Sequence, residues 1–213
     1  MQVQNFIDGA FSGTAQVLNN VAPGTGELYG TIPRSGAPEV DRAMAAAKRA
    51  FPGWSSTPVA ERAACLDKLA DAVQRHAAML AEAEARDNGK PVSLAGQVDI
   101  PRAEKNLRFY ASGIQHFASQ SHAMDGEAIN YTLRKPLGVV ACISPWNLPL
   151  YLFTWKVAPA LAAGNCVVAK PSELTPVTAY LLSTWIEEAG FPPGAFNVLH
   201  GLGPEVGEAM VTH

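Results

Sequence analysis

The amino-acid sequence predicts an α/β protein in which a parallel β-sheet follows a helical segment and an N-terminal β arm. Three observations support this fold class. The second half of the chain contains three short, continuous apolar runs, which suit strands buried on both faces. Segments long enough for helices separate these runs. The strand and helix patterns alternate, which is typical of parallel strands joined by right-handed helical crossovers.

The first part of the chain divides into an arm and three expected helices. Residues 5–33 are rich in glycine-containing turns between short β-like pieces, so we expect an arm or hairpin lying on another element. The first helix has Pro38 in its opening turn, where proline is tolerated. The second begins at Thr57-Pro58 and ends at Asn88-Gly89, and the third covers roughly residues 93–119.

The second half supplies the expected sheet. Its strands cover residues 139–143, 166–169 and 196–199, with helices at about 149–163, about 176–189 and from Pro204. Before them, the residues from Ile129 to Arg134 alternate weakly, like an exposed strand. The third strand is the last strand in the chain, so we expect its edge of the parallel sheet to be uncovered.

Composition and charge exclude several classes of protein. The net charge of −3 provides no basic footprint for nucleic acid. No apolar run reaches the roughly eighteen residues of a membrane span. The N-terminus lacks the basic and apolar regions of a secretory signal. We therefore expect no nucleic-acid or membrane partner and a cytoplasmic location.

The cysteines and histidines do not form a recognisable metal site. Cys65, Cys142 and Cys166 include no C-x-x-C pair, and the five histidines have no metal-ligand spacing near them. Cys142 and Cys166 lie within apolar, strand-like runs, so we interpret both as buried structural thiols rather than nucleophiles.

The loop after the first expected strand, residues 144–149, is stiffened by two prolines around a Trp-Asn pair. A stiff loop can hold the amide of Asn147 in a fixed direction, where it could donate to a developing oxyanion. The alternative is an asparagine that closes the loop by bonding to its own backbone. Local chemistry does not separate these two interpretations.

The loops after the other two strands also carry polar or glycine-rich sequences. Lys170-Pro171-Ser172-Glu173 follows the second strand, and an acidic residue there can accept hydrogen bonds from a nucleotide ribose. The alternative is a solvated Lys/Glu pair capping the next helix. The third loop has the spacing G-x-G-x-x-x-G from Gly201 to Gly207, which permits close backbone approach to a ligand but is a weak signal alone.

Taken together and in this order, the segments 145–149, 170–173 and 203–207 resemble those of the aldehyde dehydrogenase superfamily. The resemblance covers essentially the whole chain and corresponds to the N-terminal part of the family. It implies an incomplete Rossmann-like parallel sheet. Within the superfamily, residues 99–103, 130–134 and 143–155 are similar to the 2-aminomuconate and 2-hydroxymuconate semialdehyde dehydrogenases. Other aldehydes remain alternative substrates.

The resemblance implies roles for individual residues. Asn147 would donate to the oxyanion, and Lys170 and Glu173 would hold the adenosine ribose of NAD. A carboxylate at that place disfavours the 2′-phosphate of NADP. The residues expected to line the rest of the cofactor groove are Ile143, Ser144, Pro145, Trp146, Ser172, Gly203 and Gly207.

The resemblance also places two residues at the substrate. Enzymes of the muconic branch oxidise a semialdehyde that bears a carboxylate, and Arg102 corresponds to an arginine that meets this carboxylate. Trp155 would lie near the substrate tunnel. The alternative for Arg102 is an ordinary surface arginine on the third helix.

The resemblance divides the chain into residues 1–125, the arm and helices; 126–136, an oligomerisation-type strand; and 137–213, a partial dinucleotide-binding unit. Family members are roughly twice as long and form homodimers or homotetramers. Their nucleophilic cysteine, catalytic glutamate and catalytic domain lie beyond the position of His213. We therefore expect a truncated enzyme that is inactive by itself and whose NAD binding is weak or undetectable. The alternatives are a non-catalytic fragment that binds a nucleotide or partner, and a remnant without a ligand.

Overall fold

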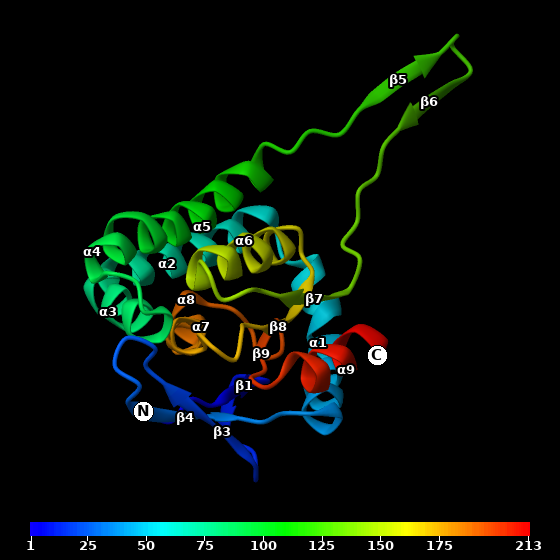
Figure 1. Cartoon of the computed structure of the whole chain (residues 1–213). Coiled ribbons are helices and arrows are strands. Elements are labelled where there is room, and N and C mark those ends of the chain that lie inside the picture. The colour runs from blue at the N-terminus through cyan, green and yellow to red at the C-terminus, as the bar shows by residue number, and fades with distance from the viewer.

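The computed structural model describes residues 1–213 and is built around a mixed five-stranded sheet (Figure 1). The strand order is β2-β1-β9-β8-β7. The strands are β1 (Asn5–Ile7), β2 (Ala10–Ser12), β7 (Val139–Ile143), β8 (Cys166–Lys170) and β9 (Phe196–Val198). The last three are parallel, and β1 pairs antiparallel with both β2 and β9. The predicted α/β class with a parallel sheet is thus confirmed.

The expectation that the third strand leaves an open sheet edge is wrong. Phe6 of β1 pairs with Val198 of β9, so the N-terminal arm covers that edge. The terminal strand on the other side is β7, whose Ala141 and Ile143 are exposed. The central strand β8 is buried along its whole length, as expected for a strand covered on both faces. The arm also forms a separate hairpin of β3 (Val17–Val21) and β4 (Leu28–Pro33).

Helices cover the sheet, and their bounds are as follows. Before the parallel strands lie α1 (Ala37–Ser56), α2 (Val59–Arg75), α3 (Ala77–Asn88), α4 (Val92–Leu94), the π-helical turn η1 (Ala95–Asp99) and α5 (Ile100–Gln115). Between and after the strands lie α6 (Pro149–Ala162), α7 (Val177–Ser183), α8 (Ile186–Ala189), the π-helical turn η2 (Gly203–Gly207) and α9 (Glu208–Thr212). In Figure 1, α2, α5 and α6 gather above the sheet, and α1 and α9 lie together at its right-hand side. No helix is both long and apolar enough to span a bilayer.

Two of the expected helices differ from the prediction. The expected second helix is two helices, because the backbone at His76 leaves the helical region at φ −106° and ψ 19°. The His76 ring stacks on Trp185, with 4.7 Å between the ring centroids. The expected third helix contains η1 and ends at Gln115, not near residue 119. The end at Gly89 is confirmed, since this residue adopts φ 81°.

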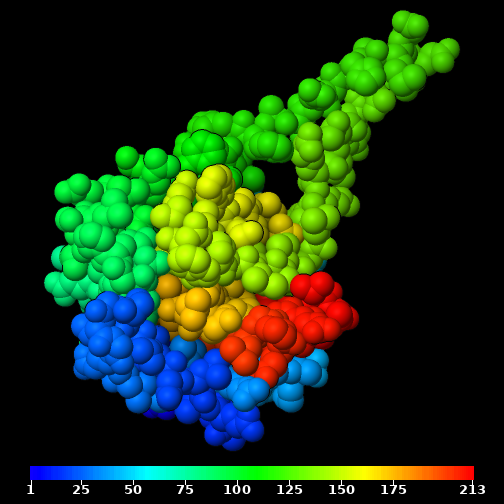
Figure 2. All heavy atoms as spheres, in the orientation of Figure 1, coloured from blue at the N-terminus to red at the C-terminus, as the bar shows by residue number.

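A long β-hairpin extends away from the body of the protein (Figures 1 and 2). Its strands β5 (Ser121–Met124) and β6 (Ala128–Tyr131) are antiparallel, and every residue in them is exposed. The predicted exposed strand therefore exists as β6, whereas sequence reasoning missed its partner β5. The division of the chain at residues 125 and 136 stays a prediction.

The core is one continuous cluster of 44 buried residues that joins the sheet to its helices. Phe153 of α6 and Phe196 of β9 meet edge to face near its centre, with 6.2 Å between ring centroids. Cys142 and Cys166 belong to this core at 4% and 0% exposure. Their burial agrees with the interpretation of both residues as buried structural thiols.

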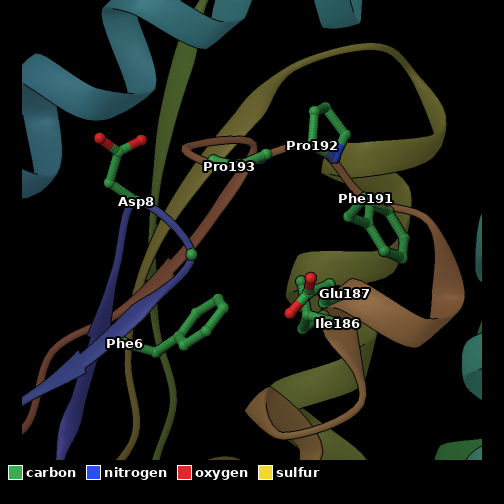
Figure 3. Close-up of a pocket in the computed structure, with 8 residues that line it drawn as sticks. Phe6, Asp8, Ile186, Glu187, Phe191, Pro192 and Pro193 are labelled. Carbon is green, nitrogen blue, oxygen red and sulfur yellow. The ribbon is translucent and has the colours of Figure 1, made fainter.

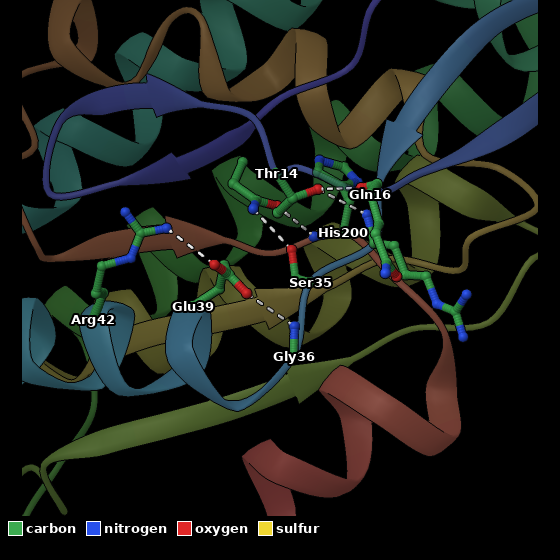
Figure 4. Close-up of polar contacts among 9 residues, drawn as sticks. Thr14, Gln16, Ser35, Gly36, Glu39, Arg42 and His200 are labelled. Carbon is green, nitrogen blue, oxygen red and sulfur yellow. Dashed lines mark hydrogen bonds and ion pairs between the residues drawn. The ribbon is translucent and has the colours of Figure 1, made fainter.

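Asn5 fastens the N-terminal arm to the sheet. Its amide nitrogen donates to Ser35 Oγ over 2.8 Å, and its Oδ1 accepts from the backbone N–H of His200 over 2.8 Å. Ser35 N–H in turn donates to the carbonyl of His200 over 3.1 Å. Figure 4 shows Ser35 and His200 side by side. Near them, the Glu39 carboxylate accepts a hydrogen bond from the backbone N–H of Gly36, the N-cap residue of α1. Segments from both ends of the chain therefore meet at one buried amide.

We predict that Asn5→Ala lowers the free energy of unfolding by about 1–3 kcal/mol, because it leaves a buried N–H and a buried hydroxyl without their partner. Asn19→Ala, at an exposed position of the same arm, serves as the control and is expected to stay within about 0.5 kcal/mol of wild type. Urea unfolding measures both. Equal effects of the two substitutions would show that the Asn5 contacts add no stability.

Candidate functional site

Three loops meet at the carboxyl ends of β7, β8 and β9, where open α/β sheets bind their ligands. The backbone N–H of Ser144 donates to the carbonyl of Lys170 over 3.0 Å, which joins the first two loops. A Cβ placed on Gly207 would lie 3.7 Å from Lys170 Cδ and 3.9 Å from Ile143 Cδ1. Ile143, Lys170 and Gly207, one from each loop region, therefore lie close together, with Ile143 exposed and the other two buried.

Lys170 and Glu173 form an ordered ion pair in the second loop. Lys170 Nζ donates to Glu173 Oε2 and to the carbonyl of Pro171, each over 3.0 Å. The Lys170 side chain is only 3% exposed, whereas that of Glu173 is 30% exposed. A solvated pair would leave both side chains free, so the structure does not support that alternative for Lys170. Ser172, buried beside them, accepts from the backbone N–H of Leu174 over 3.2 Å.

The third loop keeps open space above its backbone. No atom lies within 4 Å of a Cβ placed on Gly203, at the start of η2. Arg34 holds this turn from the arm, because its Nε donates to both carboxylate oxygens of Glu205 over 2.9 and 3.1 Å. The hydrogen bonds from Arg34 lower the pKa of Glu205. The glycine loop is thus held by the ion pair between Arg34 and Glu205, and its backbone at Gly203 stays accessible.

In the first loop, the side chains are exposed and the main chain is held. Pro145, Trp146 and Asn147 are exposed, with Trp146 at 55%. Their backbone is anchored from α3 and the turn after it: Asn88 Nδ2 donates to the Trp146 carbonyl over 2.8 Å, and Lys90 Nζ donates to the Asn147 carbonyl over 3.2 Å. The alternative in which Asn147 bonds to its own backbone has no such bond in the structure to support it.

A buried charge cluster under the first loop was missed by sequence reasoning. Lys90 pairs with Asp99 and lies 3.9 Å from Glu84, and the side chains of the two acids are 1% and 0% exposed. Glu84 Oε2 also accepts from the backbone N–H of Leu150, in the first turn of α6, over 3.2 Å. Burial raises the pKa of Glu84 to about 7. The sequence indicates this region only through the segment 88–91, which ends a predicted helix and belongs to the part of the chain that the family resemblance covers.

Asp87 plays the corresponding part for the second loop. Its Oδ2 accepts from the backbone N–H of Val177, the first residue of α7, over 2.8 Å. Its Oδ1 accepts from Asn20 over 3.1 Å and from the hydroxyl of Tyr29. Burial raises the pKa of Asp87 to about 7. The C-terminal end of α3 therefore caps both helices that follow the first two loops.

The two predicted substrate residues lie together on α5 and α6. The guanidinium carbon of Arg102 is 5.5 Å from the ring centroid of Tyr151, and Arg102 Nη1 lies 3.4 Å from the Tyr151 hydroxyl. Tyr151 stacks on Trp155 with 5.3 Å between centroids. Sequence reasoning named Arg102 and Trp155 but missed Tyr151, because a tyrosine on an apolar helix gives no separate signal.

Two hollows in the surface differ in position. One of about 260 Å³ lies beside the first two loops, lined by Val21, Pro23, Asp87, Asn88, Trp146, Leu174 and Thr175. Another of about 160 Å³ lies between the turn after β1 and the segment before β9 (Figure 3). Its lining includes Phe191, Pro192 and Pro193, which precede β9, so it lies at the amino end of the sheet and away from the three loops.

No cysteine in the chain is suited to act as a nucleophile. Burial raises the pKa of Cys142 and of Cys166 to about 11, and burial also raises the pKa of the half-buried Cys65. A thiol of this kind is protonated at neutral pH and reacts slowly. No group of histidine, cysteine and acidic side chains is arranged to hold a metal ion.

We predict that the free energy of unfolding falls by about 2 kcal/mol or more as the pH rises from 4.5 to 7, and then levels off. Glu84 and Asp87 titrate near 7 when folded and near 4.5 and 3.8 when unfolded, so the folded state binds more protons in this interval. Glu84→Gln and Asp87→Asn should each reduce the slope, and the double variant should flatten it. Urea unfolding at several pH values measures this, and an unchanged slope in the double variant would refute it.

Comparisons with known proteins agree with this geometry. The profile of the aldehyde dehydrogenase family matches residues 11–213. The 2-aminomuconic semialdehyde dehydrogenase of Bos taurus is 50% identical over 214 residues, which are 100% of this chain and 44% of the relative. The 2-hydroxymuconic semialdehyde dehydrogenase of Pseudomonas sp. (strain CF600) is 44% identical over 218 residues, covering 99% of this chain and 45% of the relative.

Solved structures give the same result. The NAD+ complex of an aldehyde dehydrogenase from Bacillus cereus matches with a TM-score of 0.97 and 36% identity, covering 100% of this chain and 44% of that one. The chain thus spans less than half the length of these relatives. The resemblance read from the three loop segments is confirmed. By its fold, its loops and these similarities, the chain belongs to the aldehyde dehydrogenase family.

Proposed function

We propose that this chain supplies the cofactor side of an NAD-dependent dehydrogenase that oxidises an aldehyde to a carboxylic acid. The observation that carries the proposal is the meeting of Ile143, Lys170 and Gly207, from three different loop regions, at the carboxyl ends of three parallel strands. A dinucleotide binds at this place in open α/β sheets. Because the chain spans 44% of its relatives' length, the activity of a whole enzyme is part of the proposal.

The residues of the second and third loops fit a dinucleotide. The Lys170 ammonium and the partly exposed Glu173 carboxylate supply a donor and an acceptor for ribose hydroxyls. The Glu173 charge would repel a 2′-phosphate, so we propose NAD rather than NADP. We propose that the rest of the cofactor groove would be lined by Ile143, Ser144, Pro145, Trp146, Ser172, Gly203 and Gly207. When bound, NAD supplies the acceptor for the hydride that leaves the aldehyde carbon.

Asn147 is proposed as the side-chain donor to the oxyanion that forms when the aldehyde carbon is attacked. Its exposed amide is carried by a loop whose backbone is anchored on both sides of it. A donor that is already oriented stabilises developing charge without reorganising during the reaction. The nucleophile and the general base of the reaction are not among the roles that we assign to this chain.

The proposed substrate is a semialdehyde that carries a carboxylate, of the muconic type. Arg102 is exposed and charged, and the Tyr151 and Trp155 rings beside it form an apolar wall. A guanidinium binds a carboxylate through two parallel hydrogen bonds. The relatives at 50% and 44% identity are named for such semialdehydes.

A second copy of the chain is the proposed partner. In the hairpin of β5 and β6, the side chains of Met124, Ile129 and Tyr131 are 52%, 74% and 66% exposed. Large apolar side chains gathered on an exposed hairpin are typical of a surface that another protein covers. Homodimers or homotetramers would bury these side chains. A cytoplasmic location, without nucleic-acid or membrane partners, completes the proposal.

We predict that NAD binds weakly and through its adenosine end. Saturation-transfer NMR should show contact to the adenosine ribose protons, and Lys170→Met should reduce this signal by about tenfold, because a charge-assisted hydrogen bond is lost. Glu173→Gln should raise the NADP signal relative to NAD. Arg75→Met, at an exposed ion pair with Glu188, is the control. Equal signals in wild type and Lys170→Met would exclude the proposed ribose site.

We also predict that these 213 residues alone form no NADH from NAD and a semialdehyde, because each cysteine thiol has a raised pKa. Absorbance of NADH measures this. Aldehyde-dependent NADH formation that survives purification, and disappears in a variant lacking one of the three cysteines, would contradict the prediction and identify the nucleophile.

A further inference from the structure

The two peptide groups that flank Asn147 are both held by side chains from one place in the fold. The peptide before Asn147 contains the Trp146 carbonyl, which accepts from Asn88 Nδ2 over 2.8 Å. The peptide after it contains the Asn147 carbonyl, which accepts from Lys90 Nζ over 3.2 Å. A peptide group is planar, so a hydrogen bond to its carbonyl restricts the orientation of the whole group. With both peptide groups restricted, the direction of the Asn147 Cα–Cβ bond is restricted as well.

Lys90 is itself ordered by buried charge. Its side chain is 9% exposed and is paired with Asp99, with Glu84 Oε1 at 3.9 Å. Glu84 uses its other oxygen to accept from Leu150 N–H over 3.2 Å. The same carboxylate thus holds the lysine and the first turn of α6, on the far side of Asn147. Glu84 Oε1 and Asp99 Oδ1 have no hydrogen-bond partner, so the cluster is costly for stability.

A cluster that costs stability calls for another reason to exist. Buried ion pairs add little net stability compared with apolar packing, but they define geometry because charged hydrogen bonds are directional. Apolar side chains could fill the space under the loop, yet they could not bond to a carbonyl. The two donors reach the loop from α3 and the turn that follows it, so a rigid helix carries the anchor.

We propose that Lys90 and Asn88 are positioning residues for Asn147, with Glu84 and Asp99 holding Lys90 in place. They fix the two peptide groups around Asn147, so that the direction in which its side chain leaves the backbone is set before any ligand arrives. The inference rests on the proposed function, in which this amide donates to the oxyanion. Lys90 and Asn88 act through the backbone of the loop and do not touch the substrate.

The test is the mobility of the loop in the 213-residue chain, without NAD or aldehyde. Backbone order parameters from nitrogen relaxation report the amides of Trp146, Asn147 and Leu148. In wild type they should be about 0.85, the value of a rigid backbone. In Lys90→Met and in Asn88→Ala they should fall below about 0.6. Lys90→Arg keeps a charged donor and should restore most of the order.

Arg62→Met is the matched control. Arg62 is also a buried cation, 7% exposed, and its Nε donates to the Ala162 carbonyl over 3.0 Å, at the opposite end of α6. The variant should lower the melting temperature and leave the order parameters of the loop unchanged. If Lys90→Met does not fold, Asn88→Ala decides, because Asn88 is only half-buried and its loss is milder.

Three outcomes would overturn the inference: a mobile loop in wild type, a loop that stays rigid in Lys90→Met or Asn88→Ala, or equal loosening in Arg62→Met. The proposed function fails by different results, since it depends on NAD contacts and on aldehyde oxidation. A loop that loosens as expected in a chain without any NAD contact would refute the proposed function and leave the positioning role intact.

Discussion

The structure depends on the C-terminal end of α3, where buried acids cap two other helices. Glu84 accepts from the first turn of α6 and Asp87 from the first residue of α7. Both helices begin where a site loop ends, so the positions of these loops follow from one helix end. A carboxylate at a helix N-terminus satisfies free N–H groups and interacts favourably with the helix dipole. Here burial opposes that gain, because it raises the pKa of both acids to about 7, and a large fraction of each is therefore uncharged at physiological pH.

The N-terminal arm solves a different problem, that of the sheet edge. A strand with unpaired N–H and C=O groups is a template for aggregation. The arm lays β1 along β9 and fastens it with Asn5, which bonds to Ser35 and His200. Arg34 then reaches from the end of the arm to Glu205 in the third loop. The arm therefore covers the sheet and supports the glycine turn of the proposed cofactor groove.

Charge and shape divide the proposed site into two regions. On the cofactor side, Lys170, Glu173 and the glycine loop present charge and open backbone at the strand ends. On the substrate side, Arg102, Tyr151 and Trp155 present a cation beside stacked rings. Asn147 lies on the loop between β7 and α6, which connects the two regions. A hydride transfer needs the cofactor and the aldehyde to meet, and in the proposed function they would meet at this loop.

The sequence by itself determined the alternation of the three parallel strands with their helices and the three loops after the strands, because apolar periodicity and local turn chemistry are encoded by neighbouring residues. The sequence also identified the family, because the loop segments 145–149, 170–173 and 203–207 occur together in it. Only the tertiary structure decided the helix break at His76, the β1 pairing on β9 and the charge cluster of Glu84, Lys90 and Asp99. The first two depend on residues far apart in the chain, and the charge cluster depends on the burial of side chains from three neighbouring segments, none of which leaves a periodic signal.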